Sequence, residues 1–421
     1  MIEVKREERE RAILIALSTG AYTEEQVEEH LDELELLADT AGADTIFKIT
    51  QEKSKPDPAY FIGRGKAEEI AQLIQVNDIQ LIIFDDDLNP TQVRNLEKLF
   101  GRKVLDRSGL ILDIFASHAK TKEAKTQVEL AQLQYMLPRL TRAWTHLSKQ
   151  YGGIGTKGPG EKQIETDRRI IRTRISKLKE YLKKIESQQE TKSSSHKKFV
   201  TAALVGYTNA GKSTLLNRLT NANVLAENKL FATLDSTTRA CELEKNKKIL
   251  LSDTVGFIRK LPHHLIASFK STLNVVRDAD IILHVIDITN PYFEEHIKVV
   301  ENTLEQLGCE KKIQIKIFNK IDLLKEKSIL NTINQRFPNS LFISAERGIG
   351  ITNLKDLLLD YYEANFNEYQ LKLKHNQSKN ISIIYELAEV YDTIYKDDYI
   401  LLKYRASKPI QNKIIKLVNH N

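Results

Sequence analysis

One segment of this 421-residue chain constrains its fold more than any other. An apolar run over residues 199–205 leads into a glycine-rich loop, 206–213, and a helical pattern follows over 214–219. The loop reads G-x-x-x-x-G-K-S, and a strand–loop–helix context is where this motif binds phosphates. A chance glycine turn does not explain that context. The glycines let backbone amides curl around phosphates, and the helix N-terminus adds positive potential. The predicted phosphate-binding residues are Gly206, Tyr207, Thr208, Asn209, Ala210, Gly211, Lys212 and Ser213.

Lys212 should reach the β- and γ-phosphates of a nucleoside triphosphate, and the Ser213 hydroxyl should ligate Mg²⁺. A second apolar strand, over 249–252, ends in D-x-x-G. After a phosphate-binding loop, this motif predicts one residue that holds Mg²⁺ through water and a glycine amide that bonds the γ-phosphate. The four residues of this second motif are Asp253, Thr254, Val255 and Gly256.

Two later segments predict the base. A strand over 313–318 precedes Asn319, Lys320, Ile321 and Asp322. The Asp322 carboxylate can accept the N1–H and the 2-amino group of guanine, whereas adenine offers an acceptor at N1 and no 2-amino group. A further strand ends at Ser344, Ala345 and Glu346, where a backbone amide can contact the guanine O6. These motifs resemble those of P-loop GTPases. A P-loop ATPase does not explain the N-K-x-D motif at residues 319–322.

Two residues of this site are unusual. Ras-like GTPases carry a water-orienting glutamine after D-x-x-G, and here that position is Phe257. We therefore expect slow hydrolysis by the isolated protein and stimulation by a partner. Asn209 has two interpretations: it tolerates the loop backbone, which we favour, or it ligates K⁺.

The fold class that these patterns predict is α/β. The P-loop GTPase domain (199–365) should follow a small parallel α/β domain (1–115), an antiparallel helical hairpin (116–190) and a linker (191–198). A small α+β unit (366–421) should complete the chain. In the first domain we expect strands near 12–17, 44–50, 81–84 and 104–105. A capping box at Thr23 and Gln26 and an N-cap at Asn89 should start two of its helices. In the last unit we expect a helix over 381–395 and a strand over 398–404.

The hairpin is predicted from two heptad-like seams, at Leu130–Leu133–Leu137–Leu140–Trp144–Leu147 and Ile171–Ile175–Leu178–Leu182–Ile185. Pro138 should kink the first helix or mark a helix start. Five of residues 151–160 are glycine, so we expect no regular structure there. Residues 188–198 read as a polar linker.

Charge is unevenly distributed although the whole chain carries only +6. Residues 1–60 hold seven basic and 15 acidic side chains, whereas 139–198 hold 16 basic and six acidic ones. The second segment suits a polyanion such as RNA, or it is a solvated helix face. Two cysteines give no disulfide framework. A charged N-terminus and the lack of a long apolar run predict a soluble, cytoplasmic chain without integral membrane association. Nothing requires an oligomer, so we expect a monomer.

The whole chain resembles the HflX GTPases. The resemblance rests on residues 60–66, 84–90, 126–133, 152–161, 231–235 and 253–259, although Lys162 and Ser236 depart from the more usual threonine and proline. It implies a GTP-hydrolysing switch that binds the large (50S) ribosomal subunit, including its rRNA, and acts in ribosome splitting, rescue or biogenesis. It also assigns switch I to Phe231, Ala232, Thr233, Leu234 and Asp235, with Thr233 as a second Mg²⁺ ligand.

A basic hairpin with a glycine tip would contact rRNA through Lys149, Lys157, Lys162, Arg168, Arg169 and Arg172. The alternative function is a GTPase whose hairpin recruits a protein, with RNA binding incidental. Gly63-Arg-Gly65 is either a helix-entry turn, which we favour, or a second nucleotide site. Asp85–Asp87 is either a solvated turn, which we favour, or a metal site.

Overall fold

A computed structural model describes residues 9–143, 159–193, 199–220, 230–231, 237–244, 247–261, 270–326, 328–375 and 377–419. The chain divides into two compact units. Unit 1 comprises residues 1–182 together with 228–234 and 260–269, and unit 2 comprises the remainder.

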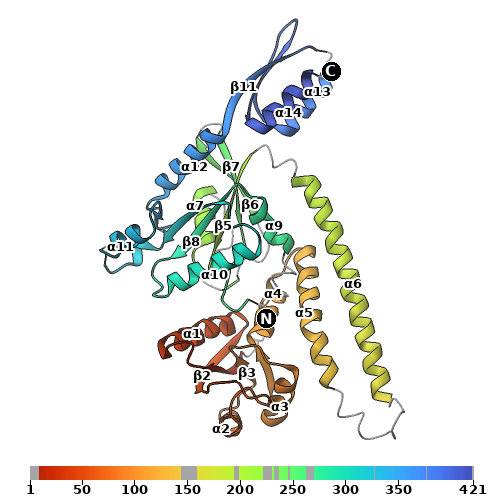
Figure 1. Cartoon of the computed structure of the whole chain (residues 1–421), viewed down its shortest axis with the longest axis vertical. Helices are drawn as coiled ribbons and strands as arrows, with labels where there is room; N and C mark the ends of the chain where they lie inside the picture. The colour runs from red at the N-terminus through yellow and green to blue at the C-terminus, as the bar shows by residue number, and fades with distance from the viewer. Residues whose placement is uncertain are drawn as a thin grey trace, which may run out of the picture. The chain divides into compact units, whose positions relative to one another are not determined.

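Unit 1 begins with a four-stranded sheet whose strand order is β2-β1-β3-β4, and every described pairing in it is parallel. Helices alternate with these strands, as Figure 1 shows in red to orange. The parallel α/β prediction is therefore confirmed. The elements are β1 (Glu10–Ser18), α1 (Glu24–Thr40), β2 (Ala43–Glu52), α2 (Arg64–Val76), β3 (Leu81–Phe84), α3 (Pro90–Phe100), β4 (Lys103–Asp106) and α4 (Arg107–His118).

Local sequence explains where these helices start. Thr23 and Gln26 form the predicted capping box on α1, and Asn89 caps α3 with Pro90 at its first position. Gly63 is the N-cap of α2, so Gly63-Arg-Gly65 lies at a helix entry. The apolar faces of α2 and α3 cover the sheet around Ile13 and Phe84, both fully buried.

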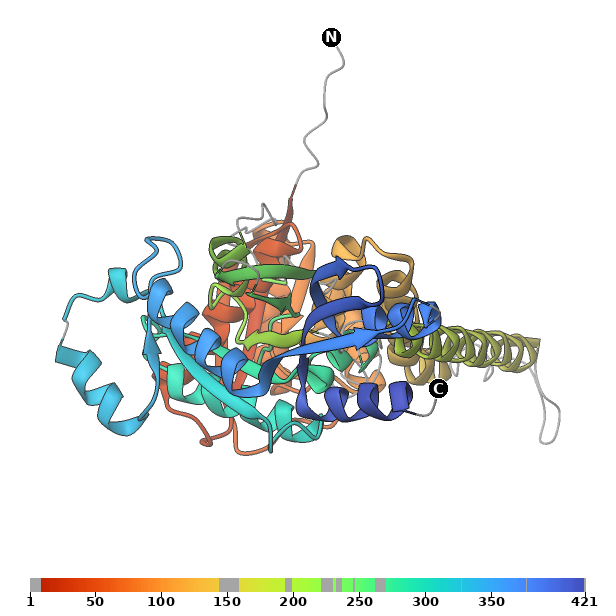
Figure 2. The same cartoon turned by 90° about the horizontal axis from the view of Figure 1, so that it is seen from above.

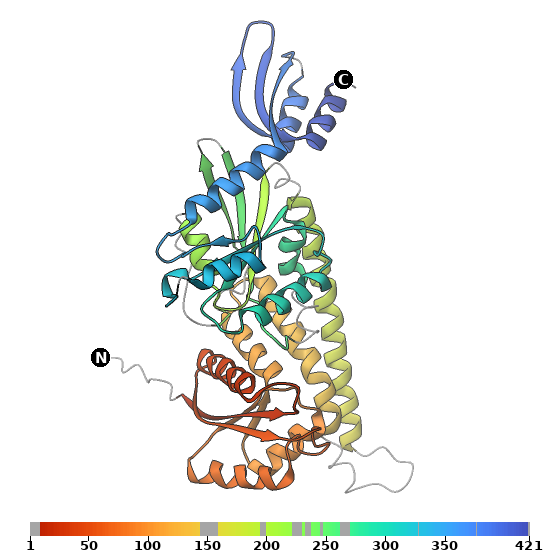
Figure 3. The same ribbon diagram turned by 60° about the vertical axis from the view of Figure 1, so that its left-hand side comes forward.

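Two long helices, α5 (Lys122–Ala143) and α6 (Pro159–Ser193), form the hairpin (Figure 3). Arg174 Nε pairs with Glu129 Oε1 across it at 2.7 Å. Pro138 lies inside α5. Trp144 and Leu147 lie outside the described residues. The seam between the helices packs Leu130, Leu133, Leu137, Ile171, Ile175, Leu178 and Leu182.

Two details of the predicted hairpin are wrong. Pro159 and Gly160, which we expected outside regular structure, form the start of α6, because proline is well suited to the first helical position. Residues 188–193, expected in the linker, continue the same helix, since glutamine, glutamate and lysine are good helix formers. Figure 2 shows α6 as one long helix.

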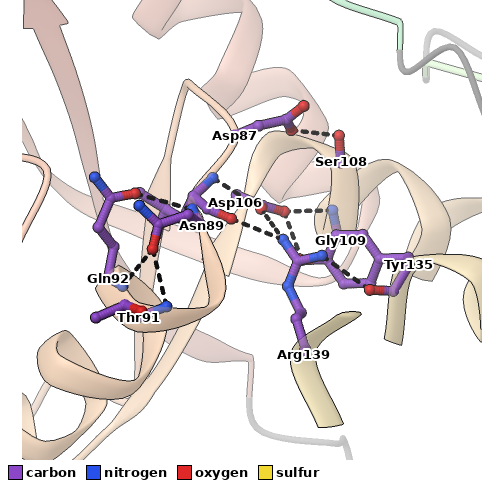
Figure 4. Close-up of polar contacts among 10 residues, drawn as sticks. Asp87, Asn89, Thr91, Gln92, Asp106, Ser108, Gly109, Tyr135 and Arg139 are labelled. Carbon is purple, nitrogen blue, oxygen red and sulfur yellow. Dashed lines mark hydrogen bonds and ion pairs between the residues drawn. The ribbon is translucent and has the colours of Figure 1, made fainter. Parts of the chain in front are cut away.

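Asp106, at the end of β4, joins the sheet to α5 (Figure 4). Its carboxylate is fully buried and accepts hydrogen bonds from the Leu88 and Gly109 amides at 3.1 and 2.8 Å. The Tyr135 hydroxyl and the Arg139 guanidinium, both on α5, also donate to it at 2.6 and 2.5 Å. The hairpin is thus fixed to this sheet by a carboxylate with four donors.

Asp85, at the end of β3, belongs to a second buried network. The solvated-turn interpretation is wrong for this residue, because only 2% of it is exposed. Arg107, equally buried, pairs with it at 2.8 Å and also pairs with Glu33. Lys260, from the 260–269 segment of unit 1, pairs with it at 2.8 Å and with Asp86. The described residues hold no cluster of three or more His, Cys, Asp or Glu side chains suited to a metal.

Unit 2 contains a six-stranded sheet with the order β10-β9-β8-β5-β7-β6, in which only β6 is antiparallel to its neighbour. Helices α7 and α12 bury one face around Leu215 and Leu354, and α10 and α11 cover part of the other around Ile297. The elements are β5 (Val200–Gly206), α7 (Lys212–Thr220), β6 (Thr237–Glu244), β7 (Lys247–Asp253), α9 (Lys270–Asp278), β8 (Ile281–Asp287), α10 (Phe293–Gln306), β9 (Ile313–Asn319), η3 (Ile321–Leu323), α11 (Ser328–Arg336), β10 (Leu341–Phe342) and α12 (Ile351–Asn365).

The C-terminal part is α+β, as predicted, but its helix is shorter than expected. The strands pair antiparallel in the order β11-β13-β12, with α13 and α14 packed on them (Figure 3). Residues 389–395, expected in the helix, form a strand because Val390, Thr393 and Ile394 are β-branched and pair with β13. The elements are β11 (Phe366–Leu373), α13 (Ser378–Leu387), β12 (Glu389–Tyr395), β13 (Ile400–Ser407) and α14 (Lys408–Asn419).

Candidate nucleotide-binding site

The carboxyl end of β5 carries the glycine-rich loop. It lies where the strand order reverses, because β7 flanks β5 on one side and β8 on the other. Such a switch point in a mostly parallel sheet is the usual place for a ligand. The predicted strand–loop–helix is confirmed, since β5 ends at Gly206 and α7 begins at Lys212.

Backbone geometry accounts for the residue types in this loop. Gly211 has φ +94°, and a Cβ there would lie 2.3 Å from Asn319 Nδ2. A side chain at Gly206 would collide with the Val285 carbonyl at 2.2 Å. Asn209 adopts φ +60°, a conformation that asparagine tolerates better than most residues.

Lys212 and Ser213 start α7 and face β7. The Lys212 ammonium donates to the carbonyls of Gly206 and Tyr207 at 3.2 and 2.8 Å. Its burial lowers its pKa to about 8. The Ser213 hydroxyl donates to Asp253 Oδ2 at 2.6 Å, and burial raises the pKa of Asp253. A hydroxyl, a carboxylate and an ammonium therefore meet beside the loop.

The second motif lies directly against the loop. The Phe257 amide donates to the Gly206 carbonyl at 3.1 Å, and the Thr208 amide donates to the Phe257 carbonyl at 2.8 Å. A Cβ on Gly256 would lie 2.8 Å from Thr208 Cγ2, so only glycine fits this approach. Phe257 itself is 2% exposed. Thr254 donates its hydroxyl to the Leu204 carbonyl at 2.7 Å.

Asn319 connects the loop to the base-recognition segments. Its side chain donates to the Ala210 carbonyl and accepts from the Ala345 amide, both at 2.9 Å. Asp322 stays near the surface of η3, with its side chain 15% exposed and Arg347 Nε at 3.9 Å. The structure thus brings Gly206–Ser213, Asp253–Gly256, Asn319–Asp322 and Ser344–Glu346 to one edge of the sheet.

Two supporting residues were not predicted. Arg218, on α7, donates to the Ala345 carbonyl at 3.0 Å and to the Glu346 carbonyl. Asp287, at the end of β8, pairs with Lys320 at 2.6 Å. The signal for Asp287 was available, because it is an acidic residue that ends an apolar strand in the same sheet.

The switch I residues are only partly described. Phe231 is buried in unit 1, where its ring meets Phe115 edge-on at 4.7 Å. Ala232, Thr233, Leu234 and Asp235 lie outside the described residues. Of the rRNA candidates, Arg169 and Arg172 are exposed on α6 and Arg168 is half-buried. Lys149 and Lys157, and the Lys162 side chain, lie outside the described part.

A phosphate-binding loop at the switch point of this sheet, with an N-K-x-D segment tied to it by Asn319, defines the class of P-loop GTPases. Three family models match the chain. They are described as GTP-binding GTPase N-terminal (residues 28–116), GTP-binding GTPase Middle Region (118–196) and 50S ribosome-binding GTPase (201–320).

Curated relatives named GTPase HflX match most of the chain. The protein of Lacrimispora saccharolytica is 46% identical over 96% of this chain and 94% of its own. The protein of Escherichia coli is 42% identical over 92% of this chain and 91% of its own. The protein of Flavobacterium psychrophilum is 51% identical over 78% of this chain and 79% of its own. The chain belongs to the HflX family of GTPases, and its activity is the hydrolysis of GTP.

One solved structure is a GTP-binding protein from the archaeon Sulfolobus solfataricus in complex with GDP. It is similar at 24% identity and a TM-score of 0.45, covering 83% of this chain and 98% of that one. None of the described helices is both long and apolar enough to cross a membrane.

Proposed function

We propose that this GTPase is a molecular switch that binds the large (50S) ribosomal subunit and acts in ribosome splitting, rescue or biogenesis. The observation that carries the proposal is the exposed basic surface of α6 in a chain that also holds a GTPase site. Lysines and arginines at 169, 172, 174, 177, 179, 183 and 184 are exposed on that helix. Phosphate contacts from such a row bind structured RNA with little sequence preference.

The nucleotide site would work through the residues already described. Lys212 binds the β- and γ-phosphates, Asp322 reads guanine, and Asn319 holds the loop and the Ala345 amide in register. The full nucleotide-binding set is the one predicted from the sequence, residues 206–213, 231–235, 253–256, 319–322 and 344–346.

Mg²⁺ fits the residues present. The Ser213 hydroxyl and the Asp253 carboxylate, 2.6 Å apart, are the hard oxygen donors that this ion prefers. Ser213 and Thr233 would hold it, and Asp253 would act through water. When bound, the ion neutralises developing phosphate charge. K⁺ at Asn209 stays the less favoured alternative, and equal turnover in KCl and NaCl removes it.

The domain limits predicted from the sequence, 1–115, 116–190, 191–198, 199–365 and 366–421, belong to this proposal, except that the hairpin extends to Ser193, where α6 ends. So do a monomeric state and a cytoplasmic location, where a ribosomal partner would be met.

Co-sedimentation of the full chain with large ribosomal subunits tests the proposal. We expect pelleting with GTP or a non-hydrolysable analogue and much less with GDP, because GTP orders the switch segments. Subunits should also accelerate GTP hydrolysis, since Phe257 cannot orient water. Nucleotide-independent pelleting, or none, contradicts the ribosomal role and favours a protein partner.

A matched pair of charge reversals tests the basic surface. Changing Arg168, Arg169 and Arg172 to Glu should abolish pelleting while GDP affinity stays within twofold. The control changes Lys408, Lys413 and Lys416, exposed on α14, to Glu. Equal losses in both variants would mean that the helix face is not specific.

A further inference from the structure

The hydroxyl of Thr208 has no assigned role although it lies inside the phosphate-binding loop. Thr208 is only 8% exposed. Among the residues that the structure describes, nothing forms a hydrogen bond with its Oγ1. Burying a hydroxyl without a partner is unfavourable, and such groups in native proteins call for an explanation. A valine would fill the same volume without that cost.

The position of Thr208 is fixed by its surroundings. Its amide donates to the Phe257 carbonyl at 2.8 Å, which holds the backbone. Its methyl carbon faces Gly256. A Cβ built on Gly256 would lie 2.8 Å from this methyl and 3.1 Å from Lys212 Nζ. Thr208 and the phosphate-binding ammonium therefore flank the same small region.

That region is where the reaction would occur. Lys212 and the Gly256 amide are the groups expected at the γ-phosphate. Phe257, where related GTPases carry a water-orienting glutamine, is buried, and its side chain has no hydrogen-bonding group. The Thr208 hydroxyl is carried on the same Cβ as the methyl that borders this point, and a rotation of about 120° about the Cα–Cβ bond exchanges the two. A hydroxyl has one donor and two acceptor lone pairs. It can supply the polar contact that Phe257 lacks.

We propose that the Thr208 hydroxyl positions the attacking water, accepting a hydrogen bond from it and donating one to a γ-phosphate oxygen. This inference rests on the proposed nucleotide site. The water oxygen forms the new bond to the γ-phosphorus while the bond to the β–γ bridging oxygen breaks. GDP leaves with that electron pair, and the water proton passes to the released phosphate. Thr208 stays neutral throughout.

The test compares Thr208→Val, Thr208→Ser and Thr303→Val in the full chain. Thr303 is the matched control because it is also 8% exposed in unit 2, and its hydroxyl bonds the Val299 carbonyl within α10. Three quantities are measured for each variant: the single-turnover rate of GTP hydrolysis, the Kd for GDP, and the Kd for GDP with aluminium fluoride, which mimics the transferring phosphoryl group.

For Thr208→Val we expect a rate about tenfold lower, equivalent to ~1.4 kcal/mol of transition-state stabilisation. Its GDP affinity should stay within twofold, and the gain in affinity from aluminium fluoride should fall by a similar factor of about ten. Thr208→Ser should keep the rate within about threefold. Thr303→Val should match the wild type. Because an unpaired hydroxyl is removed, Thr208→Val should unfold at or above the wild-type temperature.

Three results would overturn the inference. A wild-type rate in Thr208→Val means that the hydroxyl has no part in hydrolysis. Equal losses in the Val and Ser variants mean that shape rather than the hydroxyl matters. A parallel loss of GDP affinity means a structural role. Failure of the wild-type chain to bind GDP would instead contradict the proposed nucleotide site.

Discussion

At the scale of single residues, burial sets the chemistry of the nucleotide site. Lys212 is held by two loop carbonyls in a desolvated position, and desolvation lowers its pKa to about 8 from the ordinary value of 10.5. The pKa of Asp253 is raised rather than lowered for the same reason, because burial disfavours the charged carboxylate. Both charges would be stabilised by a nucleotide and its cation.

The Lys212 pKa predicts that nucleotide binding takes up protons at alkaline pH. Above pH 8 part of the unliganded protein carries a neutral lysine, and the phosphates of GDP should raise its pKa and restore the proton. Titration calorimetry at pH 8.5 in buffers of different ionisation enthalpy should show net uptake, smaller at pH 7. Binding heats that do not depend on the buffer at pH 8.5 would contradict this.

Asp322 predicts the base specificity. Changing Asp322 to Asn replaces an acceptor with an amide that also donates, so the 2-amino group of guanine loses its partner while the 2-oxo group of xanthine gains one. GDP affinity should fall at least about 100-fold, and xanthosine diphosphate should become the better ligand. Competition binding measures both. Asp356→Asn, exposed on α12, should change neither.

At the scale of elements, buried ion pairs hold the pieces of unit 1 together. Asp106 joins the end of β4 to α5 through Tyr135 and Arg139, and Asp85 joins the end of β3 to Arg107. Burial, together with the negative charge of the Asp106 carboxylate, raises the pKa of Tyr135 far above its usual value, so its hydroxyl stays a donor. Each partner depends on the other, because an isolated buried charge is expensive.

Asp106→Asn should destabilise unit 1 by about 3–5 kcal/mol, since it leaves the Arg139 charge without its carboxylate. Hydrogen exchange should rise in peptides covering β4 and α5, and the first urea transition should shift to lower concentration. The control is Asp113→Asn on α4, where the pair with Lys103 is exposed and 3.6 Å long. It should change stability by less than about 0.5 kcal/mol. Equal effects would argue against the role of Asp106.

At the scale of the whole molecule, charge is separated along the chain. The net charge of residues 1–60 is −8 and that of residues 139–198 is +10, and neither is evident from the total of +6. Two segments of opposite charge in one chain would favour approach of the basic segment to a polyanion and disfavour approach of the acidic one.

The proposed binding of RNA by the hairpin should therefore be strongly salt-dependent. The logarithm of the affinity for large ribosomal subunits should fall linearly with the logarithm of KCl concentration. Changing Arg168, Arg169 and Arg172 to Glu should flatten this slope by about two to three units. Changing the three α14 lysines to Glu should leave the slope unchanged. Filter binding over 50–300 mM salt measures both. Identical slopes in all variants would contradict contact through α6.

The sequence by itself determined the elements that depend on neighbours in the chain. The phosphate-binding loop, the caps at Thr23 and Asn89 and the seam of α5 and α6 follow from local spacing, because helix caps, glycine turns and heptads are short-range features. Only the tertiary structure decided which distant groups meet. It paired Asp85 with Arg107 and Lys260, placed Arg218 on the Ala345 carbonyl and turned residues 389–395 into a strand. It also left the Thr208 hydroxyl without a bonding partner among the described residues. Burial and long-range pairing depend on the whole packed chain, so no local pattern carries them.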